Sequence, residues 1–171
     1  NMLNNSLFGV NETVREYVRL TQELDARDTP VVLVLFGDHK PWMGNGGSVY
    51  EEMGIDFDTS TLAGFRNYYA TPYLIWANRA AKEVLGADFT GDGGDFSPCF
   101  LMTRLFDACG WAGPGYMQLS RAMRDISPLL HTNGLFLHDG VLTSVLSDTD
   151  RSFYRSWLAV QYYREHVAAY S

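Results

Sequence analysis

A chain of 171 residues is long enough for one domain with a sizeable core, and 46% of its residues are hydrophobic, a globular rather than a disordered composition. The formal net charge of −7 repels phosphate backbones, so we expect no nucleic-acid partner. The charge does not exclude an anionic substrate, because a bound metal ion can reverse the field locally.

Neither a secretion signal nor a membrane-spanning segment is visible. No apolar run approaches the ~20 residues that a transmembrane helix needs, so we expect this chain itself to be soluble. Its first residues, "NMLNNSLFGVNETV", show neither a start signal nor a tidy domain edge. We therefore expect a fragment of a longer protein, whose targeting signals lie on the preceding part.

The first predicted elements are a helix and a buried strand. Residues 11–27 place apolar side chains on one helical face, with Asn11 as the N-cap. Residues 31–36, "VVLVLF", form a continuous apolar run, which is typical of a strand covered on both faces in a parallel sheet. Residues 37–48 are rich in glycine and predict a loop, with a short helix around 48–54.

A second strand is predicted at 73–77, followed by helical turns that end at Gly86. Two central strands are too few for a doubly wound sheet. Either more strands lie within 55–66, or the rest of the sheet belongs to the preceding part of the protein.

The second half of the sequence is rich in predicted helices. Ser97 and Pro98 predict a helix start, with the serine hydroxyl as the cap and the helix ending at Gly110. A further helix is predicted from near 113–114 until just before Pro128, and Asn133-Gly134 predicts a hairpin turn. From Asp150 a last helix is expected to bury one face, formed by Phe153, Trp157, Val160, Tyr163 and Val167. The fold class is therefore α/β, with residues 1–171 as a single unit.

An acid and an imidazole follow directly on the first predicted strand. Ligands bind outside the carboxyl ends of strands in open α/β sheets, and Asp38 and His39 lie at such an end. A carboxylate and an imidazole together suit Zn²⁺ or Mn²⁺. The alternative is that Asp38 caps the following turn and His39 packs or faces water. Lys40 is either a neutraliser of a bound anion or a solvated lysine, and Trp42 is either a wall of the site or a loop anchor.

Other polar clusters carry weaker signals. His131 and His138 flank the Asn-Gly turn and are read as surface histidines rather than metal ligands, and the aspartates of "DFTGDGGD" are read as a polar turn. No nucleophile-elbow, P-loop or dinucleotide-binding motif is present. The residues thus supply two candidate ligands and no obvious nucleophile.

The stretch "VVLVLFGDHKPWMG", with "TPYLIWAN" downstream, resembles the C-terminal part of the lipoteichoic acid synthase-like sulfatase family of the alkaline phosphatase superfamily. The similarity continues through "FSPCFLMTRLFDACGW", "GYMQLSRAMRDISPLL" and "WLAVQYYREH" and covers nearly the whole chain. It implies an α/β/α sandwich of which residues 1–171 form the C-terminal portion.

The resemblance also implies a metal site. One divalent ion, usually Mn²⁺ with Zn²⁺ or Mg²⁺ as alternatives, is held by Asp38 and His39 together with an acidic residue and a threonine nucleophile. That acid, that nucleophile and the substrate-binding residues precede this segment in the family. The missing N-terminal half of the same domain is thus an expected partner. The implied parent is membrane-anchored, with an extracytoplasmic catalytic domain.

The implied activity is phosphoglycerol transfer from a lipid, or hydrolysis of phosphate or sulfate esters linked to lipids or glycans. This chain alone is then expected to be inactive and to bind metal weakly. A non-catalytic envelope or glycan-binding module with a vestigial site is the alternative, and a phosphomutase or another headgroup transferase of the superfamily is a third interpretation. A sheet cut in half leaves an unpaired edge, which predicts self-association by strand pairing into a homodimer.

Overall fold

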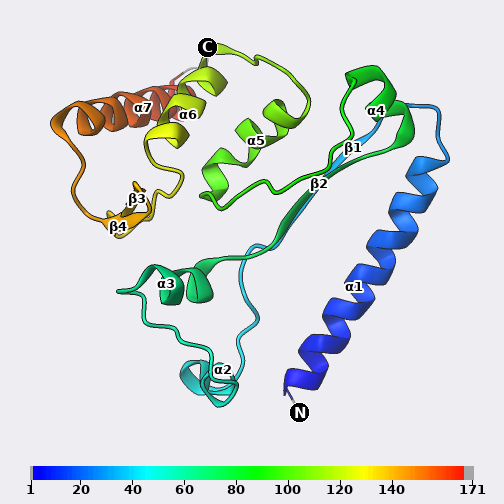
Figure 1. Ribbon diagram of the computed structural model, residues 1–171, viewed down its shortest axis with the longest axis horizontal. Helices are drawn as coiled ribbons and strands as arrows, with labels where there is room; N and C mark the ends of the chain where they lie inside the picture. The colour runs from blue at the N-terminus through cyan, green and yellow to red at the C-terminus, as the bar shows by residue number, and fades with distance from the viewer. Residues whose placement is uncertain (1, 168–171) are drawn as a thin grey trace. The chain divides into compact units, whose positions relative to one another are not determined.

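The computed structural model describes residues 2–167 and divides into two compact units at the boundary between Thr90 and Gly91. Helices and two small antiparallel sheets give a mixed α/β protein, as the sequence predicts (Figure 1). That they belong to one catalytic domain stays a prediction.

The first helix, α1, runs from Met2 to Asp25, so it begins nine residues before the predicted start. Asn11 lies inside the helix, and its assignment as an N-cap is therefore wrong. Residues 2–10 contain no proline, and Gly9 at an interior position costs only about 1 kcal/mol. Arg19 forms ion pairs with Glu16 and Glu23 at helical spacing, which adds a few tenths of a kcal/mol each, as is typical of such exposed pairs.

Both predicted strands of the first unit are confirmed. Strand β1, Val32–Phe36, pairs with β2, Tyr73–Ala77. The pairing is antiparallel, so the predicted parallel arrangement is wrong for these two strands. The expected cover on both faces is also wrong, because the Phe36 side chain is 57% exposed.

Between β1 and β2 the chain forms short helices joined by loops, with no strand among residues 37–72. The single-turn helix η1, Asn45–Gly47, leads into α2, Ser48–Glu52, which confirms the short helix predicted there. Helix α3, Leu62–Tyr69, covers the end of residues 55–66, and that segment contains no strand. Its N-cap Thr61 accepts a hydrogen bond of 3.0 Å from the Gly64 amide. Glycine is required at position 64, because a Cβ there would lie 2.1 Å from a backbone oxygen.

Asn78 connects most elements of the first unit. It is fully buried and caps helix α4, Arg79–Leu85, by accepting from the Ala81 amide at 2.9 Å. The same oxygen accepts from the Val31 amide just before β1. The side-chain nitrogen donates to the carbonyl oxygens of Leu24 and Thr29 at 3.0 and 2.9 Å. One amide thus holds the end of α1, the start of β1 and the start of α4 together.

The second unit is built around three buried side chains. Helix η2, Pro98–Phe100, continues into α5, Leu101–Ala108, and α6, Gly115–Ile126, packs against α7, Asp148–His166. Phe100, Met123 and Trp157 form the core between them. The Trp157 indole donates a hydrogen bond of 3.0 Å to the Ser120 hydroxyl, so the buried indole N–H has a partner. The three predicted helices are confirmed.

Ser97 does not cap the helix as predicted. Its hydroxyl donates to the Leu130 carbonyl at 3.1 Å and accepts from the Leu130 amide at 2.8 Å. The side chain therefore ties the start of η2 to the segment after α6. Pro98 still occupies the first helical position, where its missing N–H costs nothing.

The small sheet of the second unit turns at a different dipeptide from the predicted one. Strands β3, Phe136–His138, and β4, Val141–Thr143, are joined by Asp139-Gly140, both with left-handed backbones (φ 47° and 76°). Asn133-Gly134 also turns the chain, but it closes only a single bridge between Leu130 and Phe136. The hairpin is therefore predicted in the correct region but at the wrong dipeptide. Asp-Gly favours the same type of hairpin turn as Asn-Gly, so the dipeptide alone does not distinguish the two positions.

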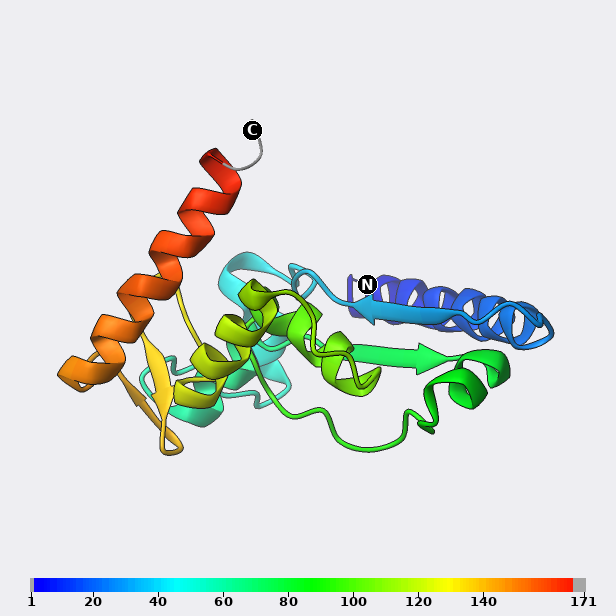
Figure 2. The ribbon, with the colours of Figure 1, turned by 90° about the horizontal axis from the view of Figure 1, so that it is seen from above.

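The last helix buries only the first part of its predicted apolar face. Phe153 packs against the core around the buried Trp157, whereas Val160, Tyr163 and Val167 are exposed. Figure 2 shows the later turns of α7 extending past the other elements of its unit. None of the helices within residues 2–167 combines the length and the apolarity that crossing a membrane requires.

Candidate metal-ligand pair at the end of β1

The backbone at the end of β1 is held by the residues that lead into β2. The Gly37 amide donates to the Pro72 carbonyl at 3.0 Å, and the Thr71 hydroxyl donates to the Gly37 carbonyl at 2.7 Å. A Cβ on Gly37 would approach the Thr71 Cβ to 3.0 Å, so glycine permits this contact. Asp38 and His39 thus directly follow a strand end whose backbone is held in place by hydrogen bonds.

Each side chain of the pair is oriented by one of its own polar atoms. Asp38 Oδ1 accepts a hydrogen bond of 2.8 Å from the His39 amide. His39 Nδ1 lies 3.0 Å from the Lys40 carbonyl oxygen, which can only accept, so Nδ1 carries the proton in this contact. In the neutral ring Nε2 then bears a lone pair. This leaves Asp38 Oδ2 and His39 Nε2 facing each other at 3.5 Å.

This separation suits two ligands of one metal ion. Oxygen and nitrogen ligands at about 2.0–2.2 Å from a metal are about 3 to 3.5 Å apart in octahedral or tetrahedral coordination. The Asp38 and His39 side chains are 81% and 78% exposed, so both atoms are accessible to an incoming ion. The backbone contact of His39 Nδ1 is also the type that orients metal-binding histidines. The two residues therefore fit a divalent metal ion.

The ligand set is incomplete within this chain as described. Among residues 2–167 no group of three or more His, Cys, Asp or Glu side chains is placed to hold an ion. The two hairpin histidines have contacts of their own. His138 Nδ1 contacts the Ile126 carbonyl at 3.1 Å, and its Nε2 lies 3.7 Å from Asp139 Oδ2. His131 Nδ1 accepts a hydrogen bond of 3.3 Å from the Asn133 amide. Asp88 and Asp92 accept amide hydrogen bonds from residues two positions later, as expected of polar turns.

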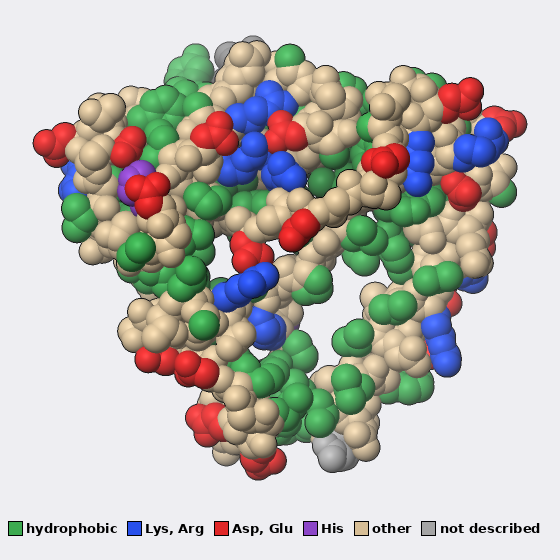
Figure 3. Space-filling view, viewed as in Figure 1, with side chains coloured by type: hydrophobic (Ala, Val, Ile, Leu, Met, Phe, Trp, Pro, Cys, Tyr) green, Lys and Arg blue, Asp and Glu red, His purple; other side chains and the backbone are tan. Residues whose placement is uncertain are grey.

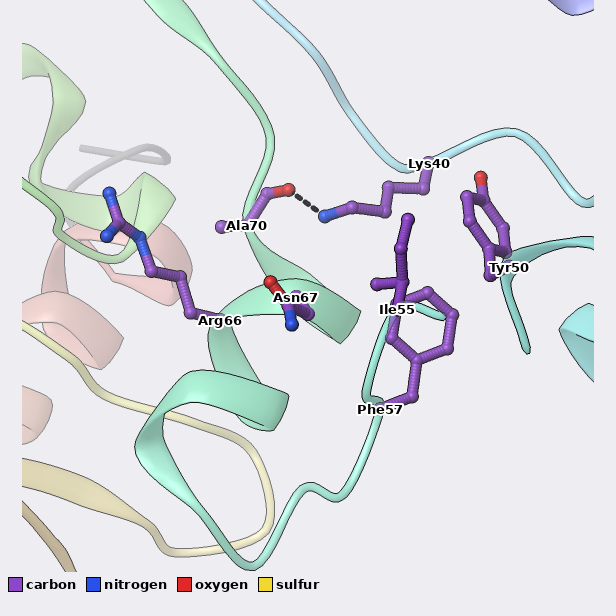
Figure 4. A pocket seen from close by; sticks show the side chains of 7 residues that line it. All are labelled: Lys40, Tyr50, Ile55, Phe57, Arg66, Asn67 and Ala70. Carbon is purple, nitrogen blue, oxygen red and sulfur yellow. Dashed lines mark hydrogen bonds between the residues drawn. The ribbon is translucent and has the colours of Figure 1, made fainter. Parts of the chain in front are cut away.

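Lys40 is not the solvated lysine that its residue type favours. Its ammonium donates a hydrogen bond to the Ala70 carbonyl, and burial lowers the pKa of Lys40. It borders a surface hollow of about 340 Å³, where it extends above Ile55 and Phe57 towards Ala70 (Figure 4). Arg66 also lines this hollow, and its guanidinium points away from Lys40 (Figure 4). Of the residues that line this hollow, Lys40 is the one adjacent in sequence to the candidate ligands.

Trp42 does not anchor the loop, since its side chain is 74% exposed. The neighbouring Met43 is buried in its place. The Tyr50 hydroxyl donates to the Pro41 carbonyl at 2.8 Å and provides a second attachment of the loop to the unit. The indole of Trp42 is therefore available to contact another molecule.

Two residues that organise the first unit were not predicted from the sequence: Asn78, which holds the start of β1, and Thr71, which holds the end of β1 before the pair. Asn78 carries a recognisable signal, because an asparagine between a strand and a helix is a typical N-cap. Thr71 carries none, because its partner Gly37 is 34 positions away in the sequence.

Comparison of the chain with models of known protein families, with curated proteins and with solved structures gave no match. The assignment of a function therefore depends on the pair's geometry and on the motif that contains it.

Proposed function

We propose that this chain is the C-terminal part of a metal-dependent enzyme similar to the lipoteichoic acid synthase-like sulfatases, and that Asp38 and His39 supply half of its metal site. The observation that carries the proposal is the 3.5 Å separation of Asp38 Oδ2 and His39 Nε2. Both atoms are accessible, while the opposite atom of each side chain is engaged with backbone.

The proposed reaction is phosphoglycerol transfer from a lipid, or hydrolysis of a phosphate or sulfate ester on a lipid or glycan. A divalent ion, in this proposal Mn²⁺ with Zn²⁺ or Mg²⁺ as alternatives, would supply Lewis-acid stabilisation of the transferred group when bound. Asp38 contributes a full negative charge towards the ion, and His39 contributes a neutral nitrogen in a fixed tautomer. Neither side chain needs to move a proton.

The remaining groups of the site would come from a preceding part of the same catalytic domain. Two exposed apolar surfaces of the first unit support the proposal that a further part of the domain packs against it. The ribbon of β1 and β2 is the whole of its sheet among the described residues, and Leu35 and Phe36 on it are exposed. Figure 3 shows hydrophobic side chains on the surface over α1, where Leu7, Val10 and Val14 are all more than half exposed.

These surfaces are what an α/β/α sandwich would cover with further strands and helices. The proposal therefore includes the alkaline phosphatase-like fold for the whole domain, with the parent protein membrane-anchored and its catalytic domain outside the cytoplasm.

The alternative function is a non-catalytic envelope or glycan-binding module in which the pair is vestigial. The exposed indole of Trp42 favours it, because an accessible aromatic ring can stack on a sugar. The coding sequence before Asn1 discriminates the two. The enzyme requires a Thr, Ser or Cys nucleophile at a strand-to-helix turn and an acidic ligand, and the binding module has neither.

The first experiment is a Mn²⁺ titration of the 171-residue chain, followed by loss of the free-ion electron paramagnetic resonance signal. We expect weak, saturable binding of one ion that Asp38→Asn and His39→Gln each reduce at least tenfold. Asp139→Asn and His166→Gln alter the same residue types elsewhere and are the controls. Unchanged binding in both site variants would contradict the metal site.

The second experiment compares two forms of the protein. The chain together with its preceding sequence should hydrolyse a phosphate or sulfate ester in a metal-dependent manner and lose this activity on Asp38→Asn. The 171-residue chain should show no activity. Hydrolysis by the 171-residue chain alone that depends on Asp38 would contradict the division of the site.

A further inference from the structure

The second unit contains a hollow that the proposed metal site does not use. It has a volume of about 310 Å³, at the lower end of the range for small-molecule sites, and it lies between the hairpin region and the first turns of α7. Its lining is mainly apolar and includes Phe136, Leu146, Tyr154 and Leu158. Phe136 and Leu146 are buried, and the Tyr154 ring packs edge-on against Phe136 at 5.2 Å. The lining is therefore packed in place before any ligand arrives.

Two guanidinium groups border this apolar lining. Arg151 and Arg155 are four residues apart on α7, so they lie on the same face of the helix. Within residues 2–167, Arg155 forms no hydrogen bond or ion pair, and the Arg151 guanidinium has only a long bond of 3.4 Å to the Leu146 carbonyl.

The nearby acidic residues do not neutralise these arginines. Asp148 and Asp150 lie in the first turn of α7, and Asp150 accepts a hydrogen bond of 2.7 Å from the Ser147 hydroxyl that caps the helix. No carboxylate in the described part of the chain lies within ion-pair distance of either arginine. The rim of the hollow therefore keeps its positive charge.

Two hydroxyl groups complete the polar part of the hollow. The Ser144 and Tyr154 hydroxyls both belong to lining residues and have no hydrogen-bond partner among residues 2–167. Together with the two guanidinium groups they offer donors around an apolar floor. Such a combination matches a ligand that is anionic at one end and apolar at the other.

We infer that this hollow binds a small amphiphilic anion, with a phosphate or carboxylate head on Arg151 and Arg155 and an alkyl chain or ring against Phe136 and Leu158. The inference is independent of the proposed metal site, because its residues all belong to the second unit.

The test is calorimetric titration of the full 171-residue chain with octyl phosphate below its micelle concentration. We expect saturable binding of one molecule, and a loss of about tenfold or more in affinity for Arg155→Gln, since a charged hydrogen bond is removed. Arg155→Lys should restore part of the affinity. Because Arg155 has no hydrogen-bond or ion-pair partner among residues 2–167, the unfolding midpoint should stay unchanged, which separates lost binding from lost folding. Arg27→Gln changes another exposed arginine, in the first unit, and should leave binding unaffected.

Three comparison ligands define the chemistry. Inorganic phosphate tests the charge alone and octyl glucoside tests the apolar chain alone, and each should bind at least about tenfold more weakly than octyl phosphate. Vesicles with phosphatidylglycerol, compared with vesicles of phosphatidylcholine, distinguish a bilayer lipid from a free alkyl phosphate as the source of the ligand. No saturable binding of octyl phosphate, equal binding of inorganic phosphate, or full affinity in Arg155→Gln would each overturn the inference.

Discussion

Thr71 donates a hydrogen bond of 2.7 Å to the carbonyl oxygen of Gly37, the residue directly before the candidate ligands Asp38 and His39. The contact joins the exit of β1 to the entry of β2. A partly buried hydroxyl far away in the sequence thus fixes where the candidate ligands begin.

Replacing Thr71 by valine should remove this hydrogen bond with little change in shape. We expect the free energy of unfolding to fall by about 1 kcal/mol, the usual contribution of one such bond. Hydrogen exchange at the His39 amide should accelerate, because the strand end is less constrained. Thr71→Ser keeps the hydroxyl and should behave closer to the wild type in both urea denaturation and exchange. Equal exchange rates in the valine variant and the wild type would contradict this positioning role.

Asn78→Ala should be among the most damaging substitutions in the first unit. It removes hydrogen bonds to the end of α1 and to the residue before β1, together with the cap of α4, and it leaves buried backbone groups without partners. We expect a loss of about 3 kcal/mol or more, measured by urea denaturation. Asn67→Ala removes one hydrogen bond, to the Asp56 carbonyl, and is the matched control with a loss of about 1 kcal/mol. Similar losses in the two variants would contradict the central role of Asn78.

In the second unit, Trp157→Phe should leave the Ser120 hydroxyl without its buried partner. The substitution also reduces the aromatic contact with Phe100, whose ring centre lies 5.9 Å away. We expect destabilisation of about 1–3 kcal/mol by chemical denaturation. Trp111→Phe changes an exposed tryptophan and should cost much less. Unfolding of both variants at the same denaturant concentration would contradict the role of Trp157 in the core of the second unit.

Asp107 should make the second unit sensitive to acid. Burial raises the pKa of Asp107, but hydrogen bonds from Arg121 at 2.5 Å and Arg124 at 2.8 Å outweigh it, so the pKa lies below its ordinary value. A carboxyl group with a lowered pKa stabilises the fold above its unfolded pKa of about 4, and this stability is lost as the pH falls through the folded value. Asp107→Asn should remove that part of the acid dependence in denaturation curves between pH 6 and pH 2. The same slope in both proteins would contradict it.

The exposed ribbon of β1 and β2 predicts concentration-dependent self-association of the isolated chain. Leu35 and Phe36 are the exposed apolar residues on β1, and the double substitution by lysine should weaken association in sedimentation experiments. Val141→Lys alters an exposed residue of the second unit and should have no effect. A single monomeric species at high concentration would contradict strand pairing.

The elements that the sequence predicts well are those with local signals. Residues 31–36 are continuously apolar, and Gly86, with its left-handed backbone, ends α4 as predicted. The early start of α1 was not predictable from a cap, because residues 2–10 carry no terminating signal. Asn133-Gly134 and Asp139-Gly140 are chemically equivalent turns, so only the pairing of Phe136 with Thr143 decides between them.

Strand direction and site geometry depend on non-local contacts. The residues of "VVLVLF" do not determine the direction of the neighbouring strand. The antiparallel direction follows from the path that residues 37–72 take between the two strands. The sequence does place Asp38 and His39 together at a strand end. That Oδ1 and Nδ1 are engaged by backbone, while Oδ2 and Nε2 face each other, follows only from the loop conformation that Gly37 and Thr71 establish.

The central place of Asn78 has a consequence for biosynthesis. Its amide bonds to residues 54 and 47 positions earlier in the chain, at Leu24 and Val31. A nascent chain that has not yet released Asn78 from the ribosome therefore exposes β1 with neither its neighbouring strand nor its anchoring amide. During that interval the segment "VVLVLF" is an exposed and unpaired apolar segment. Segments of this kind bind chaperones, and they aggregate when no chaperone is present.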